Sequence, residues 1–360
     1  MKSKLLKPQT RTSFVTYGLL LAVFLITQIF ISTGSITSML KDLLVPLCTY
    51  SILAVSLNLT VGILGELSLG QAGFMCLGAY SGAIFSLVTQ ESIPSSWVRF
   101  PLALIIGGLF AAIFGVLIGI PVLRLKGDYL AIVTLAFGEI IKNVFAAIYF
   151  GYDSNGLHFS LKSAGDLNMK PDGKILINGA LGVTGTPNDS NYIVGFILLF
   201  LTLVIAYNFI NSRTGRAVMA IRDNRIAAES VGINITKYKL ITFALTAFLA
   251  GIAGVLFSHN LASLAASKFD YNMSILILVF VVLGGMGNIR GSVIAAVILT
   301  LLPEVLRPIS NYRMLIYAII LIVMMILTSN PVTKSYIEKY AGKIKGLFKK
   351  KKAVNDEGVE

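Results

Sequence analysis

Three polar side chains stand within an apolar stretch near residue 60, where they could line a path for a polar solute. Asn58, Ser68 and Gln71 lie among five closely spaced glycines in residues 58–80. Polar groups in the hydrocarbon of a bilayer are costly, so they usually face other helices or a water-filled path. The glycines permit a broken helix whose backbone groups contact a solute, and helix packing is the alternative. We take these three residues as candidate path residues and expect Glu66 in a cytoplasmic turn.

An ionisable pair, Glu139 and Lys142, falls inside another apolar segment. Its i,i+3 spacing places both side chains on one helix face, where the two charges can neutralise each other. A structural ion pair is the interpretation that we favour. A proton relay at the same residues would make the chain an ion-coupled secondary transporter, and this is the rival function.

A polar segment, residues 211–239, separates two uncharged apolar segments. A helix through it would gather small apolar residues on one side and Arg222, Arg225 and Glu229 on another. Gly232 then supplies a C-terminal stop. A short helix with small apolar residues and a charged flank is what a membrane protein offers to a soluble partner. We therefore predict that these four residues couple the chain to such a partner.

The sequence lacks the patterns of the common catalytic sites. It has no HExxH, no Ser/His/Asp arrangement and no soluble domain of catalytic size. Leu283–Ser292 resembles a phosphate loop but lacks its Lys-[Ser/Thr] ending, so it is expected to be a tight turn between helices. Cys48 and Cys76 are expected to be buried and unpaired. The paired acidic or histidine residues of a membrane-embedded lipid enzyme are not evident either. We expect no enzyme activity, no metal and no cofactor bound by this chain, so uphill transport would need an ion gradient or a separate subunit.

The elements that position these residues are membrane-spanning helices. The 360 residues are 56% hydrophobic and 13% charged, with a mean hydropathy of +0.81, whereas soluble domains have about 25% charged residues. Uncharged runs of roughly 20 residues predict an all-α integral membrane protein with a bundle of about ten transmembrane helices. The runs lie at residues 14–31, 43–64, 67–89, 100–122, 129–150, 192–210, 240–258, 272–288, 291–306 and 314–329.

Basic residues predict the orientation. With the N-terminus inside, 21 of the 30 Lys and Arg residues lie on the cytoplasmic side and 8 on the other, while Lys142 is intramembrane. This bias places both termini in the cytoplasm. It also accounts for the net charge of +13, so no nucleic-acid partner is expected.

The orientation defines the expected domains. They are a cytoplasmic N-terminal tail (1–13), a transmembrane domain (14–331) and a basic cytoplasmic tail (332–360), whose lysines are expected to lie against anionic membrane lipid. Within the transmembrane domain, residues 211–239 form the coupling loop. Residues 151–191 form one long extracytoplasmic loop, which either docks an external partner or has no such role.

Several separated motifs, in order, resemble a known family, the LivM-type permease subunit of ABC importers for branched-chain amino acids. The matching segments are Asn58–Tyr80, Gly127–Glu139, Ser212–Lys239, Leu283–Gly291 and Leu302–Arg307. The resemblance runs from about residue 40 to residue 331. It implies a multi-pass protein of the bacterial cytoplasmic membrane, in which the loop at Arg222–Gly232 is a coupling helix that docks on an ATPase subunit.

The resemblance also implies partners and a class of solute. The partners are a second, LivH-like permease subunit, two cytoplasmic ATPase subunits that use ATP, and an extracytoplasmic substrate-binding protein. The implied solute is leucine, isoleucine, valine or a related amino acid; urea, a sugar or a nucleoside is the alternative. The sequence departs from the family in the external loop, where Leu181–Asn188 reads LGVTGTPN instead of a Gly-Gly-Pro-Asn element, and where residues 157–177 are unusually polar.

Overall fold

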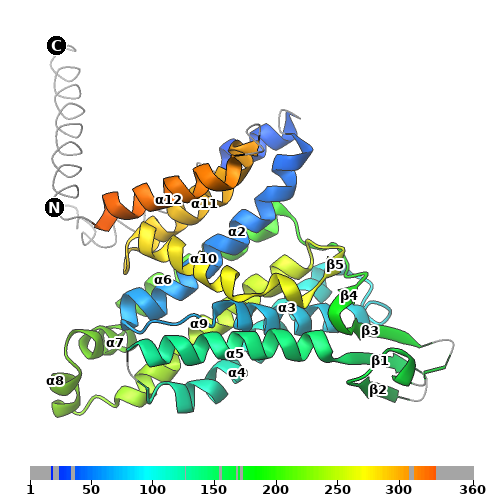
Figure 1. The fold of residues 1–360 in the computed structure, drawn as a ribbon, viewed down its shortest axis with the longest axis horizontal. Helices are drawn as coiled ribbons and strands as arrows, with labels where there is room; N and C mark the ends of the chain where they lie inside the picture. The colour runs from blue at the N-terminus through cyan, green and yellow to red at the C-terminus, as the bar shows by residue number, and fades with distance from the viewer. Residues whose placement is uncertain are drawn as a thin grey trace, which may run out of the picture. The chain divides into compact units, whose positions relative to one another are not determined.

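The chain, in a computed structural model, folds mainly as long apolar helices (Figure 1). The structure describes residues 18, 24–33, 37–125, 127–153, 156–167, 169–170, 173–307 and 312–329. Two compact units are distinguished, residues 1–301 and residues 302–360. The second unit contains helix α12 (Arg313–Ser329), and the packing described below belongs to the first.

The helices follow one another with short connections, except for the segment before α6. A helix over residues 24–32 comes first. The labelled helices are α2 (Ser38–Asn58), α3 (Gln71–Val88), α4 (Ser96–Val122), α5 (Asp128–Ala147), α6 (Tyr192–Asn211), α7 (Arg213–Asp223), α8 (Arg225–Ser230), α9 (Ile235–Ser258), α10 (Tyr271–Gly284) and α11 (Ile289–Val305). A buried π-helix, η1 (Leu59–Leu64), extends α2.

Seven of the described helical segments are long and apolar enough to cross a bilayer. They are Leu40–Leu64, Gln71–Val88, Ser96–Val122, Asp128–Ala147, Tyr192–Asn211, Ile235–Ser258 and Ala266–Gly284. The predicted runs 291–306 and 314–329 form helices of 17 residues each, shorter than the roughly 20 residues of a typical span. Half of the run 14–31 lies outside the described residues. The structure therefore supports a multi-pass helical protein without establishing the predicted number of ten spans.

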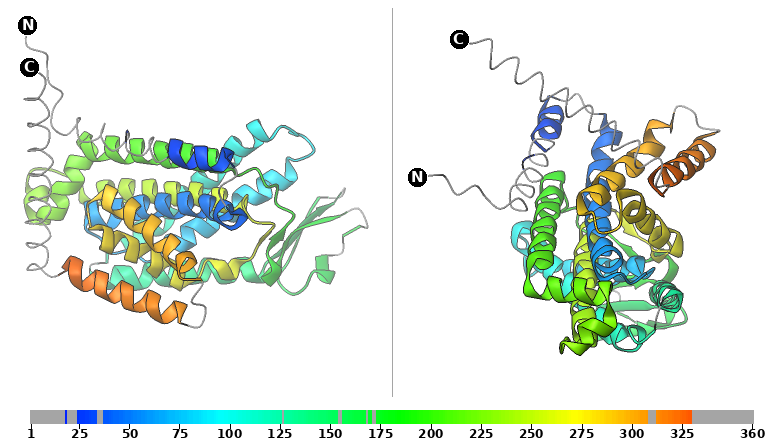
Figure 2. Two further views of the ribbon diagram at one scale, coloured as in Figure 1. Left: turned by 90° about the horizontal axis from the view of Figure 1, so that it is seen from above. Right: turned by 90° about the vertical axis from the view of Figure 1, so that its left-hand side faces the viewer.

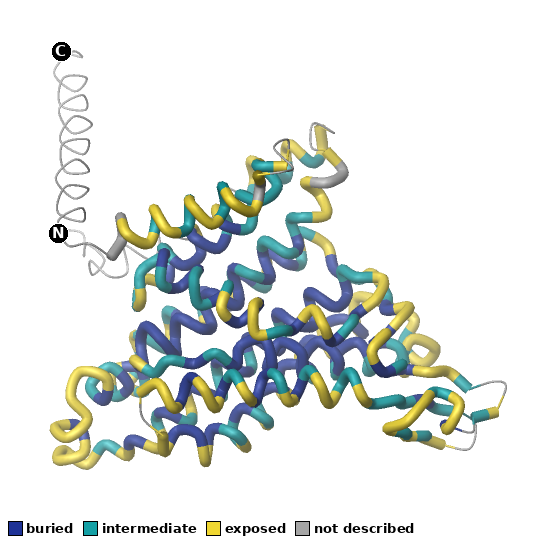
Figure 3. Tube along the Cα trace, viewed as in Figure 1, coloured by how far each residue is buried: buried dark blue, intermediate teal, exposed yellow. Residues whose placement is uncertain are grey.

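Helices α3, α4 and α9 pack against one another in the first unit, and α3 and α9 lie mostly within its buried part (Figure 3). Glycines let their backbones meet. A methyl group at Gly107 on α4 would lie 2.8 Å from the Gly78 carbonyl oxygen on α3, and one at Gly251 on α9 would lie 2.7 Å from the Gly107 oxygen. Small residues at such crossings are typical of helices that pack in a membrane.

The segment between α5 and α6 contains a small sheet, which the prediction of an all-α fold with a long loop missed. Strands β1 (Tyr149–Asp153), β2 (Gly156–Ser160) and β3 (Lys174–Asn178) pair antiparallel in the order β2-β1-β3. Strand β4 (Val183–Thr184) pairs with β5 (Ser263–Leu264), and short 3-10 helices occupy Gly165–Leu167, Gly179–Leu181 and Ala266–Lys268. Aromatic and β-branched residues favour strands, and they recur here between the Gly, Asp and Pro residues that indicated a loop.

Candidate functional site at the two ends of the bundle

The polar segment 211–239 folds as two short helices followed by the start of α9, so the prediction of a single helix was wrong. Helix α7 ends at Asp223 and α8 begins at Arg225. The residue between them, Asn224, has an extended backbone (φ −155°, ψ 106°), and its side-chain oxygen accepts a hydrogen bond from the Ala227 nitrogen at 3.0 Å. Asn is a preferred N-cap, so it starts a new helix where the apolar period alone would continue the old one.

Helix α8 turns an apolar side chain outward between two charges. Its Ala228 is buried in a small apolar cluster, whereas Ile226 is 81% exposed. The predicted coupling residues Arg225 and Glu229 are exposed on the same helix. We call Arg225, Ile226 and Glu229 the docking face. An exposed apolar residue beside charged residues suits contact with a soluble protein.

Gly232 ends this helix, as predicted. Its φ is +83°, a left-handed conformation that glycine adopts readily. Its N–H donates to the Glu229 carbonyl at 3.0 Å, and the next N–H, of Ile233, donates to the Ala228 carbonyl at 3.1 Å. These bonds satisfy the carbonyls at the end of α8. A role for Gly232 in coupling stays a prediction.

Arg222 lies apart from the docking face and reaches into the bundle. Its Nη1 donates to the carbonyl oxygen of Gly62, in the π-helix, at 3.0 Å. Its Nη2 bonds to the Asp223 carboxylate at 3.0 Å. Gly65 makes room for it, because a Cβ there would lie 2.7 Å from the Arg222 Cγ. The predicted grouping of Arg222 with Arg225 and Glu229 therefore fails, since the break at Asn224 separates them.

A second basic residue holds the same part of the chain. Lys239, near the start of α9, forms an ion pair with Glu66, and the two side chains are only 5% and 16% exposed. The Glu66 N–H donates to the Thr60 carbonyl at 3.1 Å, which ties the carboxylate to the end of η1. Glu66 thus lies in a non-helical connection, as predicted, but it is a structural partner of Lys239 there.

Asn58 joins the beginning of η1 to the turn between α10 and α11. It is fully buried; its Nδ2 donates to the Ser292 hydroxyl at 2.7 Å and its Oδ1 accepts from the Gly287 N–H at 2.8 Å. The turn at Leu283–Ser292 is the tight connection that the sequence predicted, with Gly287 at φ +83°. Contacts from α7, α9 and this turn therefore converge on residues 58–66. We call Asn58–Glu66 the π segment.

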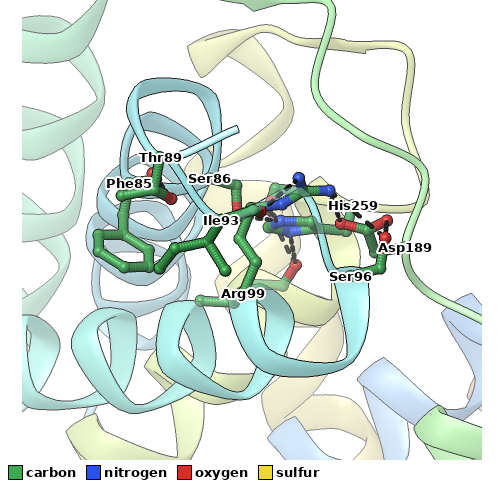
Figure 4. Close-up of polar contacts among 10 residues, drawn as sticks. Phe85, Ser86, Thr89, Ile93, Ser96, Arg99, Asp189 and His259 are labelled. Atoms are coloured by element: carbon green, nitrogen blue, oxygen red, sulfur yellow. Dashed lines mark hydrogen bonds and ion pairs between the residues drawn. The ribbon is translucent and has the colours of Figure 1, made fainter. Parts of the chain in front are cut away.

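A different polar cluster lies at the opposite ends of the same helices (Figure 4). Arg99, in the first turn of α4, donates to the Asp189 carboxylate at 2.8 Å, and the Ser96 hydroxyl donates to its other oxygen at 2.8 Å. The Arg99 side chain is 5% exposed. Burial acts to raise the pKa of Asp189, but the hydrogen bonds from Arg99 and Ser96 and the Arg99 charge outweigh it, so the pKa is lowered.

His259, directly after α9, completes this cluster. It is fully buried, lies 2.7 Å from the Ser86 hydroxyl through Nε2, and has Nδ1 2.9 Å from the Val255 carbonyl. Burial lowers its pKa below the ordinary value of 6.5. No pattern in the sequence indicated the cluster, because Arg99, Asp189 and His259 are about 70 to 160 positions apart. It ties together the ends of α3, α4 and α9 and the chain that enters α6.

Comparison with known proteins places these features in a family. The family described as branched-chain amino acid transport system / permease component matches residues 39–328, which is most of the chain. The chain belongs to this permease family.

Three relatives indicate the range of the family. The LivM permease protein of the high-affinity branched-chain amino acid transport system of Salmonella typhimurium is 33% identical, with 95% of this chain and 82% of the relative covered. The LivH protein of the same system is 25% identical, with 70% and 79% covered. The ribose import permease protein RbsC of Haemophilus influenzae is 26% identical, with 88% and 92% covered. No solved structure matches the chain.

The candidate path residues of this permease are all buried. Gln71 donates to the Ser56 hydroxyl, Asn58 has the partners given above, and Ser68 is 2% exposed. Through the Ser56 hydroxyl, Gln71 contacts α2 two residues before Asn58. Their place in a substrate path stays a prediction.

The intramembrane charges of the permease form a structural unit. Lys142 pairs with Glu139, as the spacing predicted, and the other Glu139 oxygen accepts from the Tyr271 N–H at 2.9 Å. Glu139 thereby caps the start of α10. Among the described residues, no group of three or more His, Cys, Asp or Glu residues is placed to hold a metal ion.

Proposed function

We propose that this permease is the membrane-spanning subunit of an ATP-driven importer for leucine, isoleucine, valine or a related amino acid. The observation that carries the proposal is the 33% identity to LivM over 95% of the chain. The docking face on α8 supports it, because it offers a surface to a separate ATPase subunit. The contacts of the neighbouring Arg222 and Lys239 with the π segment support it too, because they connect this part of the chain to the bundle.

The proposed complex supplies what the chain lacks. A LivH-like subunit would pair with it in the membrane, two cytoplasmic ATPase subunits would use ATP, and an extracytoplasmic binding protein would deliver the solute. The chain itself would bind no cofactor. Both termini and residues 211–239 would face the cytoplasm, in agreement with the distribution of basic residues.

The contacts of the π segment give a route for coupling. Closure of the ATPases on ATP would pull the docking face, and Arg222 and Lys239 would carry the displacement to Gly62 and Glu66. π-Helices occur frequently at functional sites, where backbone geometry changes at low cost. Exposure of Asn58 to a substrate would require its bonds to Gly287 and Ser292 to break, which would couple the opening of a path to movement of the α10–α11 turn.

The test exchanges the charges of the docking face. The assembled transporter is reconstituted in proteoliposomes, and uptake of labelled leucine is measured with ATP hydrolysis. The double variant Arg225→Glu, Glu229→Arg should reach the membrane and lose uptake. Arg216→Glu on α7, whose side chain bonds to the Asn211 carbonyl at the end of α6, is the matched control. Normal uptake by the double variant would rule out the docking face.

Two other functions are separated by the same assay. A sugar importer is the alternative favoured by the similarity to a ribose permease, and it would take up labelled ribose in preference to leucine. The ion-coupled secondary transporter is the alternative motivated by Glu139 and Lys142. Its uptake would survive loss of the ATPase subunits and collapse with an uncoupler, whereas the proposed importer would show the reverse.

A further inference from the structure

An apolar cavity of about 340 Å³ opens between the helix over residues 24–32, α2, α6 and α11. Figure 2 shows the first of these helices lying along α6, where the Thr27 hydroxyl and the Tyr192 hydroxyl are 2.6 Å apart and the Phe24 and Phe196 rings stack. The cavity belongs to neither polar cluster described above. The proposed transport mechanism does not use it.

The lining is arranged in rows along the helices. On α2 the row is Leu40, Leu44, Leu47, Cys48 and Ser51, with the i, i+4, i+7, i+8, i+11 spacing of one helix face. Helices α6 and α11 contribute similar rows, centred on Phe196 and Val297. The cavity is therefore a groove that runs along the helices rather than a round hole.

The groove is open at one end and closed at the other. Leu40, at the first end, is 41% exposed, whereas Cys48 is 4% exposed and Ser51 fully buried. Eleven residues of helix separate Leu40 from Ser51, which is about 16 Å at 1.5 Å per residue. This length is close to one leaflet of a hydrocarbon core that is about 30 Å thick.

The dimensions select the kind of molecule that fits. The whole space free of atoms in the groove, about 970 Å³ with its open side included, gives a mean cross-section of at most about 60 Å² over a length of about 16 Å. An α-helix with side chains is about 10 Å across, which corresponds to a cross-section of about 80 Å². A helix of a partner subunit is thus wider than the groove, whereas a single hydrocarbon chain is much thinner than a helix and fits.

Charge at the open end favours a lipid. Lys41 is exposed immediately after Leu40, and at 3.6 residues per turn it flanks the lining row, while the neighbouring Asp42 points to the opposite side of α2. A lysine at the end of a membrane helix extends its ammonium to the lipid headgroups. The residues of helix 24–32 that point away from the bundle, including Ile26 and Ile29, are apolar and more than half exposed, as in contact with lipid.

We propose that this groove binds one acyl chain of a membrane phospholipid, with the phosphate of its headgroup beside Lys41. The proposal requires only that the chain spans a membrane and is independent of the solute that it carries. The bound chain would join helix 24–32 to α2, α6 and α11 and fill the space between them.

The test uses a phospholipid with a photoreactive diazirine in its acyl chain. The full-length chain, assembled in the membrane of its expression host, is irradiated with this lipid, and the labelled peptides are identified by mass spectrometry. We expect labelling concentrated on residues 40–51 and on α11. Ser51→Leu fills the closed end and removes a hydroxyl that has no hydrogen-bond partner among the described residues, so it should not impair folding.

The variants give opposite outcomes for the proposal and its rivals. Ser51→Leu and Leu44→Trp should lower the labelling about tenfold. A tenfold change in affinity corresponds to about 1.4 kcal/mol, which is the contribution of about two buried methylene groups of the acyl chain. Leu117→Trp, at an exposed position of α4 outside the groove, should leave it unchanged. Lys41→Gln should weaken labelling by a phospholipid more than labelling by an uncharged diacylglycerol. Labelling spread evenly over the apolar helices, or a cross-link from Leu44→Cys to a second permease subunit in place of lipid, would overturn the proposal.

Discussion

The Arg222 guanidinium donates a hydrogen bond to the Gly62 carbonyl oxygen across 3.0 Å, which joins the short helix α7 to the buried π-helix that extends α2. The two residues are 160 positions apart. A hydrogen bond between a charged donor and a buried acceptor is stronger than a neutral one. In the proposed mechanism, a displacement of α7 would therefore act on the backbone of the π segment rather than only on its side chains.

Removal of this bond should uncouple the transporter. Arg222→Gln is expected to reduce leucine uptake in proteoliposomes by about tenfold, because a charged hydrogen bond contributes roughly 1.5–3 kcal/mol, while ATP hydrolysis by the assembled complex continues. Arg222→Lys should retain part of the uptake. Arg216→Gln is the control on the same helix, and an equal loss of uptake in that variant would mean that the charge of α7, not the bond to Gly62, is responsible.

The exposed Ile226 should be an anchor of the docking face. Ile226→Asp is expected to weaken binding of the ATPase subunits by more than tenfold, because truncation of a central interface anchor costs about 2 kcal/mol or more. The side chain is 81% exposed, so the melting temperature of the isolated permease should not change. Binding is measured by co-purification at graded salt. Ile226→Val should bind normally, and a lowered melting temperature of Ile226→Asp would indicate a structural role instead.

The buried pair Glu66–Lys239 should respond to charge reversal as a pair. Lys239→Glu leaves two carboxylates beside each other at positions where the wild-type side chains are only 5% and 16% exposed. Loss of a buried partner costs about 3–5 kcal/mol. Thermal stability in detergent should fall sharply for Lys239→Glu and recover in Lys239→Glu, Glu66→Lys. No recovery in the double variant would show that the surroundings of each position, rather than their mutual attraction, determine the stability.

Acidification should destabilise the polar cluster of Arg99, Asp189 and His259, and His259 determines the pH at which the loss of stability begins. Because burial lowers its pKa below 6.5, the unfolded chain binds the proton more readily, so stability falls as the pH drops below about 6.5. The lowered pKa of Asp189 gives stability that is present above 3.8 and is lost as the pH falls further through its folded pKa. Melting temperatures between pH 7 and 5 should fall for the wild type and stay flat for His259→Gln. An equal fall in His259→Gln would show that another group determines the pH dependence.

The sequence predicted what local spacing determines and missed what distant residues determine. The i,i+3 pair Glu139–Lys142 and the stop at Gly232 depend on neighbours within a turn, and the structure shows both. The break at Asn224 was also local, but a small side-chain cap competed with a clear apolar period and was overlooked. The family resemblance covered most of the chain, so it gave the class of protein where composition gave only a membrane location.

Pairings across the bundle had no such signal. The Arg99–Asp189 bond joins residues 90 positions apart, and Asn58 meets Ser292 across 234 positions. In each case the individual residue looked like an isolated polar side chain in or beside a membrane span. Only the packing of several helices decides whether it faces a substrate path or a partner, which is why the sequence did not predict the contacts of Asn58 with Ser292 and Gly287.

The π segment should tolerate no side chain at Gly62. A Cβ there would overlap both the Asn58 side-chain oxygen and the Gly287 backbone nitrogen, which are bonded to each other at 2.8 Å. Neither atom can yield without leaving a buried polar group unpaired, at a cost of about 1–3 kcal/mol for each group. Gly62→Ala should therefore lower the yield of folded permease and its melting temperature.

Gly138→Ala on α5 is the matched control: its Cβ would meet nothing closer than 3.7 Å, and Ala favours a helix over Gly by about 1 kcal/mol. Equal stability of the two variants would mean that the α10–α11 turn moves aside freely, and that the contact between Asn58 and Gly287 does not hold the π segment in place.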